Sequence, residues 1–362
     1  MAAGRAPARG PTGGEFERRR RAMAAMAEEA QEDGATRTLP SLRRLSRALP
    51  FGRTHGRLGT SSSGRPVASA LCSQESVDPQ KTAFLLRKAW TLYSVTPLYG
   101  LRRARLRDYA RLLSAFIAAE KQKGLAVEVG GELDIKVALS SLAELRGSEL
   151  DQPALLVQLS SRSRASSRNS EEKPLWSGWF CSMFGDDLSE NLLEDFTSLP
   201  LFLSHGAESY TALVGSWFQK TFDCCFRRLA ISPQNLSWMA AMWAGCRLDG
   251  AASAVELVFS VPRLAQPLDI SYAIHPEDAK ALWDTVQKTP GEITQEEVDV
   301  FLDCLYAHFH RHFKIHLSAA KLVKVSSAVA SAHCDGIVKI LQSQYLPGVL
   351  MLLTELAISQ IQ

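Results

Sequence analysis

The chain has 362 residues, 46% of them hydrophobic, a composition typical of a globular protein that can bury a sizeable core. Its net charge of +3 is uneven, because residues 1–80 contain thirteen arginines, no lysine and eight acidic residues, while the rest is close to neutral. The seven cysteines form no CxxC pair, and no long apolar run occurs, so the sequence argues against a disulfide framework, a signal peptide and a membrane span.

The first segment, residues 1–76, is predicted to be a disordered arginine-rich tail, because it offers few apolar residues to bury. Its run Arg18–Arg21 fits a nuclear localisation signal or a nucleic-acid patch, and it fits an ordinary solvated charge run equally well. A mitochondrial transit peptide is disfavoured by the glutamates interspersed with the arginines.

Ordered structure is expected from about Val77, in two sub-domains that cover residues 77–184 and 185–362. In the first sub-domain, Gly130-Gly131 should join two strands into a hairpin. The expected elements are a β-rich run at Trp90–Val95, a helix at Leu106–Lys123, the hairpin strands Leu125–Val129 and Glu132–Leu139, and further strands at Ala154–Ser160 and Leu175–Met183.

In the second sub-domain, the spacing of apolar residues predicts a helix over Ala212–Phe226. The segment Leu236–Cys246 has no clear period. The turn Asp249-Gly250, followed by the strand-like Ala254–Val261, favours a second hairpin there. The final apolar segment, Val349–Ile361, fits either a helix or a buried strand.

The densest hydrophobic pattern lies between residues 268 and 341. One helix should begin after His275 with Pro276 at its first position, and a second at Thr294, where Glu297 completes a capping-box spacing. After Phe313 the apolar period changes from helical to alternating, which predicts strands, and Cys334-Asp335-Gly336 should form a hairpin turn. Together these patterns predict an α+β fold with curved antiparallel sheets and helices packed on one side.

The sequence offers little that points to catalysis. It contains no P-loop, no GxSxG and no HExxH motif. His308 and His312 are four residues apart, a spacing that can bind zinc on a helix, but a zinc site needs three or four converging ligands. We therefore expect packed or half-exposed histidines, no cofactor and a non-enzymatic role.

Several long, irregular strings resemble the centromere protein L family. The resemblance covers about Val77 to Gln362. It is carried by VDPQKTAFLLRKAWTLYSVTPLY (77–99), EKQKGLAVEVG (120–130), FQKTFDC (218–224), NLSWMAAMW (235–243), and, within 274–319, IHPEDAKALWDTVQKTPGE, TQEEVD and HFHRHFKIHLSA.

This resemblance implies a nuclear scaffold subunit of the kinetochore at the centromere, with an α+β fold. It implies a heterodimer with centromere protein N, further subunits of the constitutive centromere-associated network as partners, and at most supporting contact with the centromeric nucleosome or its DNA. Neither a membrane nor a small-molecule substrate is implied. By analogy, partner contacts are expected in the C-terminal half, through strand addition at a sheet edge. The residues expected to bind the partner are Leu322, Val325, Val338, Ile340, Tyr345, Leu352, Leu356 and Ile361.

One alternative is a nucleic-acid-binding protein that uses a concave sheet and the basic tail. The near-neutral charge of the ordered part argues against it, because duplex binding needs a clustered basic face. A local stripe around the start of the first long helix, Arg102 to Arg111, leaves this alternative open; in that stripe Arg103, Arg107 and Arg111 share one face.

Overall fold

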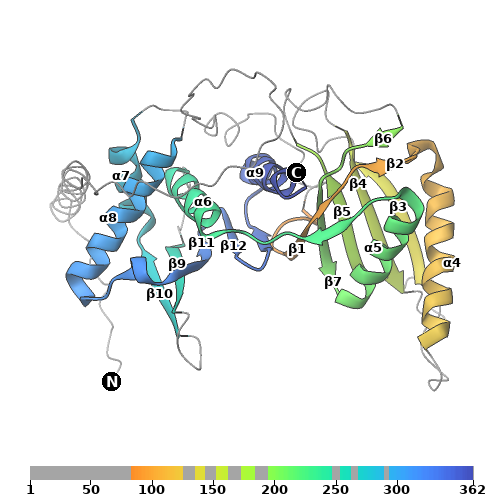
Figure 1. Cartoon of the computed structure of the whole chain (residues 1–362), viewed down its shortest axis with the longest axis horizontal. Helices are drawn as coiled ribbons and strands as arrows, with labels where there is room; N and C mark the ends of the chain where they lie inside the picture. The colour runs from red at the N-terminus through yellow and green to blue at the C-terminus, as the bar shows by residue number, and fades with distance from the viewer. Residues whose placement is uncertain are drawn as a thin grey trace, which may run out of the picture. The chain divides into compact units, whose positions relative to one another are not determined.

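The computed structural model of the chain (Figure 1) describes eight stretches of the sequence. They are residues 83–124, 135–142, 152–161, 173–183, 195–246, 253–261, 268–288 and 293–361. The arginine-rich tail, the strand predicted at Leu125–Val129 and the sub-domain boundary predicted after residue 184 lie outside them.

The described residues form a mixed α+β structure, which confirms the predicted fold class. The helices are α4 (Leu106–Gly124), α5 (Glu208–Phe222), α6 (Pro233–Gly245), α7 (Pro276–Val286), α8 (Gln295–Phe313) and α9 (Leu346–Ser359). The strands are β1 (Ala89–Val95), β2 (Leu98–Tyr99), β3 (Ile135–Leu142), β4 (Ala154–Ser161), β5 (Lys173–Cys181), β6 (Phe196–Thr197), β7 (Leu201–Gly206), β8 (Phe226–Arg228), β9 (Val255–Val261), β10 (Leu268–Ile274), β11 (Lys321–Ser326), β12 (Ala330–His333) and β13 (Ile337–Ile340). Among the helices described here, none is both long and apolar enough to cross a membrane.

The chain divides into two compact units. The larger joins Ser69–Leu236 to Val323–Gln362, and the smaller contains Ser237–Leu322. In the larger unit the strands follow the order β11-β12-β13-β1-β7-β5-β4-β3, with every neighbouring pair antiparallel. One edge of β1 is shared, because β13 pairs with Ala89 to Thr91 and β8 pairs with Tyr93 to Val95. Residues about 250 positions apart in the sequence are thus neighbours in the sheet.

The central strands of this sheet are buried on both faces. Leu201, Phe202 and Leu203 on β7 follow one another, and all three are fully buried. Phe202 belongs to a core that includes Phe218 on α5 and Leu113 on α4. Leu203 points to the opposite face because side chains alternate along a strand, and α9 contacts β1 and β7.

Helices therefore lie on both faces of the larger sheet, and the expectation of helices on one side only is corrected. The physical reason is visible in the sequence of the strands. A strand covered on both faces reads as a continuous apolar run, as LFL does in β7 and ALLV does in β4, rather than as an alternation.

The smaller unit pairs β9 with β10 along seven residues and packs α7 and α8 together through Trp283 and Phe301, whose rings meet edge to face at 5.6 Å. The predicted helix starts are confirmed. Pro276 opens α7, and Thr294 and Glu297 form a complete capping box at the start of α8.

Three segments differ from expectation or resolve an ambiguity. The hairpin favoured for Leu236–Cys246 is wrong, because residues 233–245 form α6 and β9 pairs with β10 instead. Residues from Trp238 to Ala244 on α6 are all buried, so the helix shows no polar face from which a period could be read. The C-terminal segment, left open between helix and strand, is the helix α9. The helix predicted to reach Phe226 ends at Phe222, where Asp223 adopts a left-handed conformation.

Candidate functional site

The eight residues predicted to bind a partner are almost all interior. Leu322, Val325, Val338, Ile340, Tyr345, Leu352 and Leu356 are buried within the chain, and only Ile361 is half-exposed. β12 and β13 are also paired along both edges, so neither offers a free edge. In this conformation these side chains support the elements around them, and direct partner contact at these positions stays a prediction.

A strand with an unpaired edge lies in the smaller unit. β10 pairs with β9 on one side, and no other strand of the described residues pairs with its second edge. Its first residue, Leu268, keeps 52% of its surface exposed. A row of unsatisfied backbone groups beside exposed apolar side chains is a template for strand addition by another chain.

β10 and α8 lie side by side (Figure 1), and their aromatic side chains contact each other. The ring of Tyr272 on β10 meets that of Phe309 at 5.1 Å, and Phe309 meets Phe313 at 4.6 Å. Phe313 is 61% exposed, and Ile315, just beyond the helix, is 46% exposed. Large apolar side chains this exposed on one side of a helix end are typical of an interaction surface.

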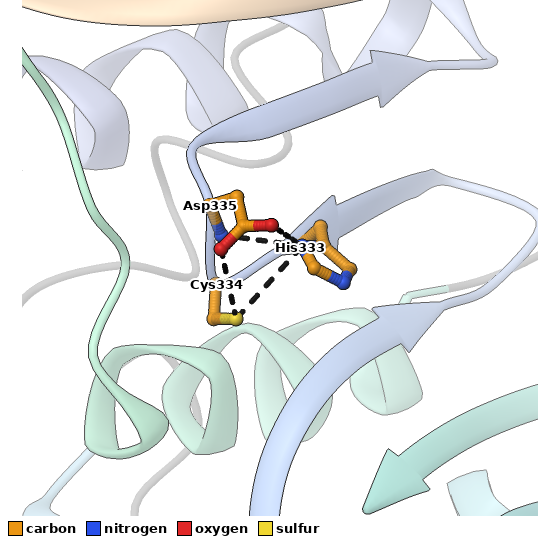
Figure 2. Close-up of side chains that lie close together, drawn as sticks. All are labelled: His333, Cys334 and Asp335. Carbon is orange, nitrogen blue, oxygen red and sulfur yellow. Dashed lines mark hydrogen bonds and ion pairs between the residues drawn. The ribbon is translucent and has the colours of Figure 1, made fainter. Parts of the chain in front are cut away.

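A second candidate is the turn between β12 and β13, where three side chains with metal-ligand chemistry converge. Figure 2 shows His333, Cys334 and Asp335 with their polar atoms directed toward one another. His333 Nδ1 lies 3.8 Å from Cys334 Sγ and 3.4 Å from Asp335 Oδ2, and Cys334 Sγ lies 3.6 Å from Asp335 Oδ1. Among the described residues, these three form a group of His, Cys and Asp side chains whose donor atoms are close enough to hold one ion.

The backbone of this turn is fixed on several sides. The amide of Cys334 donates to Val323 O at 2.8 Å, and Ile231 N donates to Cys334 O at 2.9 Å. Arg228 donates from Nε to the carbonyl oxygen of Asp335 at 3.2 Å. The three side chains therefore project from a rigid frame.

The histidines at the end of α8 form pairs and not a three-ligand cluster. The rings of His308 and His312 lie 4.6 Å apart, and those of His310 and His316 stack at 3.9 Å. Burial of the ring is the main reason that the pKa values of His308 and His310 are lowered, followed by the positive charge of the neighbouring imidazole in each pair. His308 and His310 are half-exposed, as expected, whereas His312 and His316 are exposed.

Two buried cysteines, Cys224 and Cys304, have thiols of low reactivity. Burial raises the pKa of Cys224 to about 12 and that of Cys304 to about 11, so both thiols stay protonated near neutral pH. None of the six cysteines of the described residues forms a disulfide.

The arginine stripe beside α4 is partly neutralised. Arg102 forms an ion pair with Asp195 at 2.8 Å, and Asp108 lies within 4.0 Å of both Arg105 and Arg111. Arg103 donates to two uncharged acceptors, Ser141 Oγ and Pro153 O, so its charge remains. The two carboxylates offset only part of the positive charge of the stripe, and a duplex-binding face stays an alternative.

Sequence reasoning missed both candidate sites. It predicted the turn after His333 but did not weigh His333, Cys334 and Asp335 as one group, although three ligand-type residues in a row before Gly336 are visible in the sequence. The free edge of β10 has no local signal, because whether a strand lies at an edge depends on the pairing of the whole sheet.

Comparison with known proteins places the chain in a family. The family model for centromere protein L matches residues 84–358. Centromere protein L of Gallus gallus is 72% identical over 336 residues, which is 91% of this chain and 96% of the relative. The Homo sapiens protein is 64% identical over 293 residues (80% and 85%), and the Danio rerio protein is 41% identical over 298 residues (81% of each). The chain therefore belongs to the centromere protein L family.

Proposed function

We propose that this chain is a non-enzymatic centromere subunit that pairs with centromere protein N. Through that heterodimer it supports assembly of the constitutive centromere-associated network on nucleosomes with the centromeric histone H3 variant, and so chromosome segregation. Membership of a family whose relatives are named centromere protein L supports the centromeric and nuclear location. The raised pKa values of Cys224 and Cys304 argue against these two thiols as nucleophiles.

The observation that carries the pairing proposal is the unpaired edge of β10 beside exposed Leu268, Phe313 and Ile315. A partner strand added there would satisfy main-chain donors and acceptors and cover the apolar end of α8. Arg311 and Lys314 flank this end and are exposed, so a partner segment that combines apolar and acidic residues fits it best.

The test is co-purification of the full chain with centromere protein N. The double variant Phe313→Glu/Ile315→Glu would place two carboxylates in the apolar contact, and we expect the affinity to fall by more than about tenfold. Leu112→Glu is the matched control, because Leu112 on α4 is 53% exposed and lies in the other unit. It should leave pairing unchanged.

A third variant, Ile361→Glu, tests the C-terminal placement predicted from the sequence. Loss of pairing only in Ile361→Glu would move the contact from β10 to the C-terminal segment. If all three variants co-purify like the unmodified chain, both placements are wrong. The partner should also raise the melting temperature of the chain, because a ligand that binds only the folded state stabilises it.

A further inference from the structure

We propose that His333, Cys334 and Asp335 bind one divalent transition-metal ion, with zinc as the best match. The donor set combines an imidazole nitrogen, a thiolate sulfur and a carboxylate oxygen. Sulfur and nitrogen donors select zinc-like ions over magnesium or calcium, which prefer all-oxygen sites. This inference does not depend on the proposed pairing with a partner.

The distances between the donor atoms are close to those of a tetrahedral site. The three separations are 3.4 Å, 3.6 Å and 3.8 Å. With zinc–sulfur and zinc–nitrogen bonds of about 2.3 and 2.0 Å, tetrahedral donors lie roughly 3.3 to 3.6 Å apart. Side-chain shifts of a few tenths of an ångström would therefore complete three of the four positions. Asp335 Oδ2 faces His333 and Oδ1 faces Cys334, so either oxygen can coordinate the ion.

One backbone hydrogen bond favours the His333 tautomer that a metal requires. The amide of Asp335 donates to His333 Nδ1 at 3.2 Å, so Nδ1 accepts and carries a lone pair that points into the turn. A bound ion would take this lone pair at the loss of one hydrogen bond to a neutral donor. That loss is small against the binding free energy of a thiolate–zinc site.

The backbone around the site does not need to rearrange, and the charges of the donors offset that of the ion. The backbone of Cys334 is held by Val323 and Ile231, so only side chains move on binding. Arg228 contacts the Asp335 carbonyl and is a nearby cation, but a thiolate and a carboxylate together cancel the charge of a dication. Cys334 is half-exposed and Asp335 is exposed, so an ion has a path in and the fourth position stays open.

The experiment uses the full chain, stripped of metal with a chelator and titrated with zinc against a chromogenic competitor. We expect one tight zinc equivalent. Cys334→Ser and His333→Gln should each weaken binding by more than about tenfold, because each removes a ligand. The exposed Cys225→Ser is the matched thiol control, and the double variant His308→Gln/His312→Gln is the histidine control. Both should bind zinc like the unmodified chain.

Cobalt gives a second readout of the same site. The unmodified chain and Cys225→Ser should show a thiolate-to-cobalt charge-transfer band, and Cys334→Ser should not. Zinc should also raise the urea midpoint of the unmodified chain and leave that of Cys334→Ser unchanged, a comparison that holds even if the substitution alters stability. The proposal is overturned if Cys334→Ser binds zinc as well as the unmodified chain does, or if the histidine control abolishes binding. It is also overturned if the unmodified chain binds zinc no more tightly than free cysteine does.

Discussion

Gly336 closes the turn after Asp335 with φ at +75°, in the left-handed region that side chains rarely adopt. Its Cα is also pressed against the backbone of the segment after β8, where an added Cβ would collide with the carbonyl oxygen of Leu229. Leu92 N donates to Gly336 O at 2.8 Å, so the same residue anchors the turn to β1.

Replacing Gly336 with alanine should therefore be strongly destabilising, and Gly100→Ala separates the two causes. Gly100 has φ at +69° but open space around the position of a Cβ. We expect Gly100→Ala to cost about 1 kcal/mol from backbone strain alone, and Gly336→Ala to cost roughly 1 to 3 kcal/mol more from overpacking against the backbone. Urea unfolding of both variants measures the difference. Equal losses would mean that the contact with Leu229 relaxes freely.

The residue scale also shows what the sequence could and could not predict about the site. Leu352 and Leu356 are expected from the sequence to bind a partner, and the chain itself buries both of them. An apolar period cannot distinguish a surface that the chain covers by itself from one that a partner covers, because the hydrophobic effect is non-directional. His333, Cys334 and Asp335 converge only because β12 and β13 hold the ends of their turn together.

Among the elements, α8 begins with a cap in which one side chain accepts several hydrogen bonds. Glu297 is 2% exposed, and its carboxylate accepts hydrogen bonds from the amide of Lys288 at 2.6 Å and from the amide of Thr294 at 2.7 Å. The hydroxyl of Thr294 donates to it as well, at 2.9 Å. One side chain thus caps α8 and fixes the end of the preceding loop.

Truncating Glu297 to alanine would leave two partly buried amides without their charged acceptor, and we expect a loss of about 1 to 3 kcal/mol. The neighbouring Glu296→Ala is the control, because Glu296 is exposed and only pairs with Lys288 on the surface. That change should cost less than about 1 kcal/mol. Denaturant midpoints compare the two variants, and similar losses would show that the helix dipole matters here rather than the buried hydrogen bonds.

The contrast between α8 and α6 explains where element prediction works. α8 has a capping signal and both an apolar and a polar face, so its start and its period can be read directly. α6 is buried along the whole run from Trp238 to Ala244, and its Trp238 indole donates to Gln295 Oε1 at 2.6 Å. A helix of this kind has no separate polar and apolar faces, so its sequence shows no helical period of apolar residues.

At the scale of the whole molecule, stability should depend on pH through His308. Burial of the ring lowers the pKa of His308, and the positive charges of His312 and Arg311 lower it further, while Asp278 opposes the shift. A histidine in the unfolded chain titrates at about pH 6.5. Just below that pH the unfolded state binds more protons than the folded state, so the free energy of unfolding falls as the pH drops.

We therefore expect the urea midpoint to be lower at about pH 5.5 than at about pH 7.5, and His308→Gln to reduce this difference. Arg311→Gln should reduce it partly, because it removes one of the positive charges near the ring. If both variants keep the full pH dependence of the unmodified chain, His308 does not control it.

The larger unit is interrupted in sequence by the smaller one, and this order has a consequence for synthesis. β1 leaves the ribosome early, but β13, which pairs with it, emerges only after residues 237–322 have been made. Until then the nascent sheet carries an open border at β1. A truncated transcript or a proteolytic cut that removes the last forty residues would leave this edge of β1 without β13. We expect such fragments to be degraded or to aggregate, and not to persist as partly active subunits.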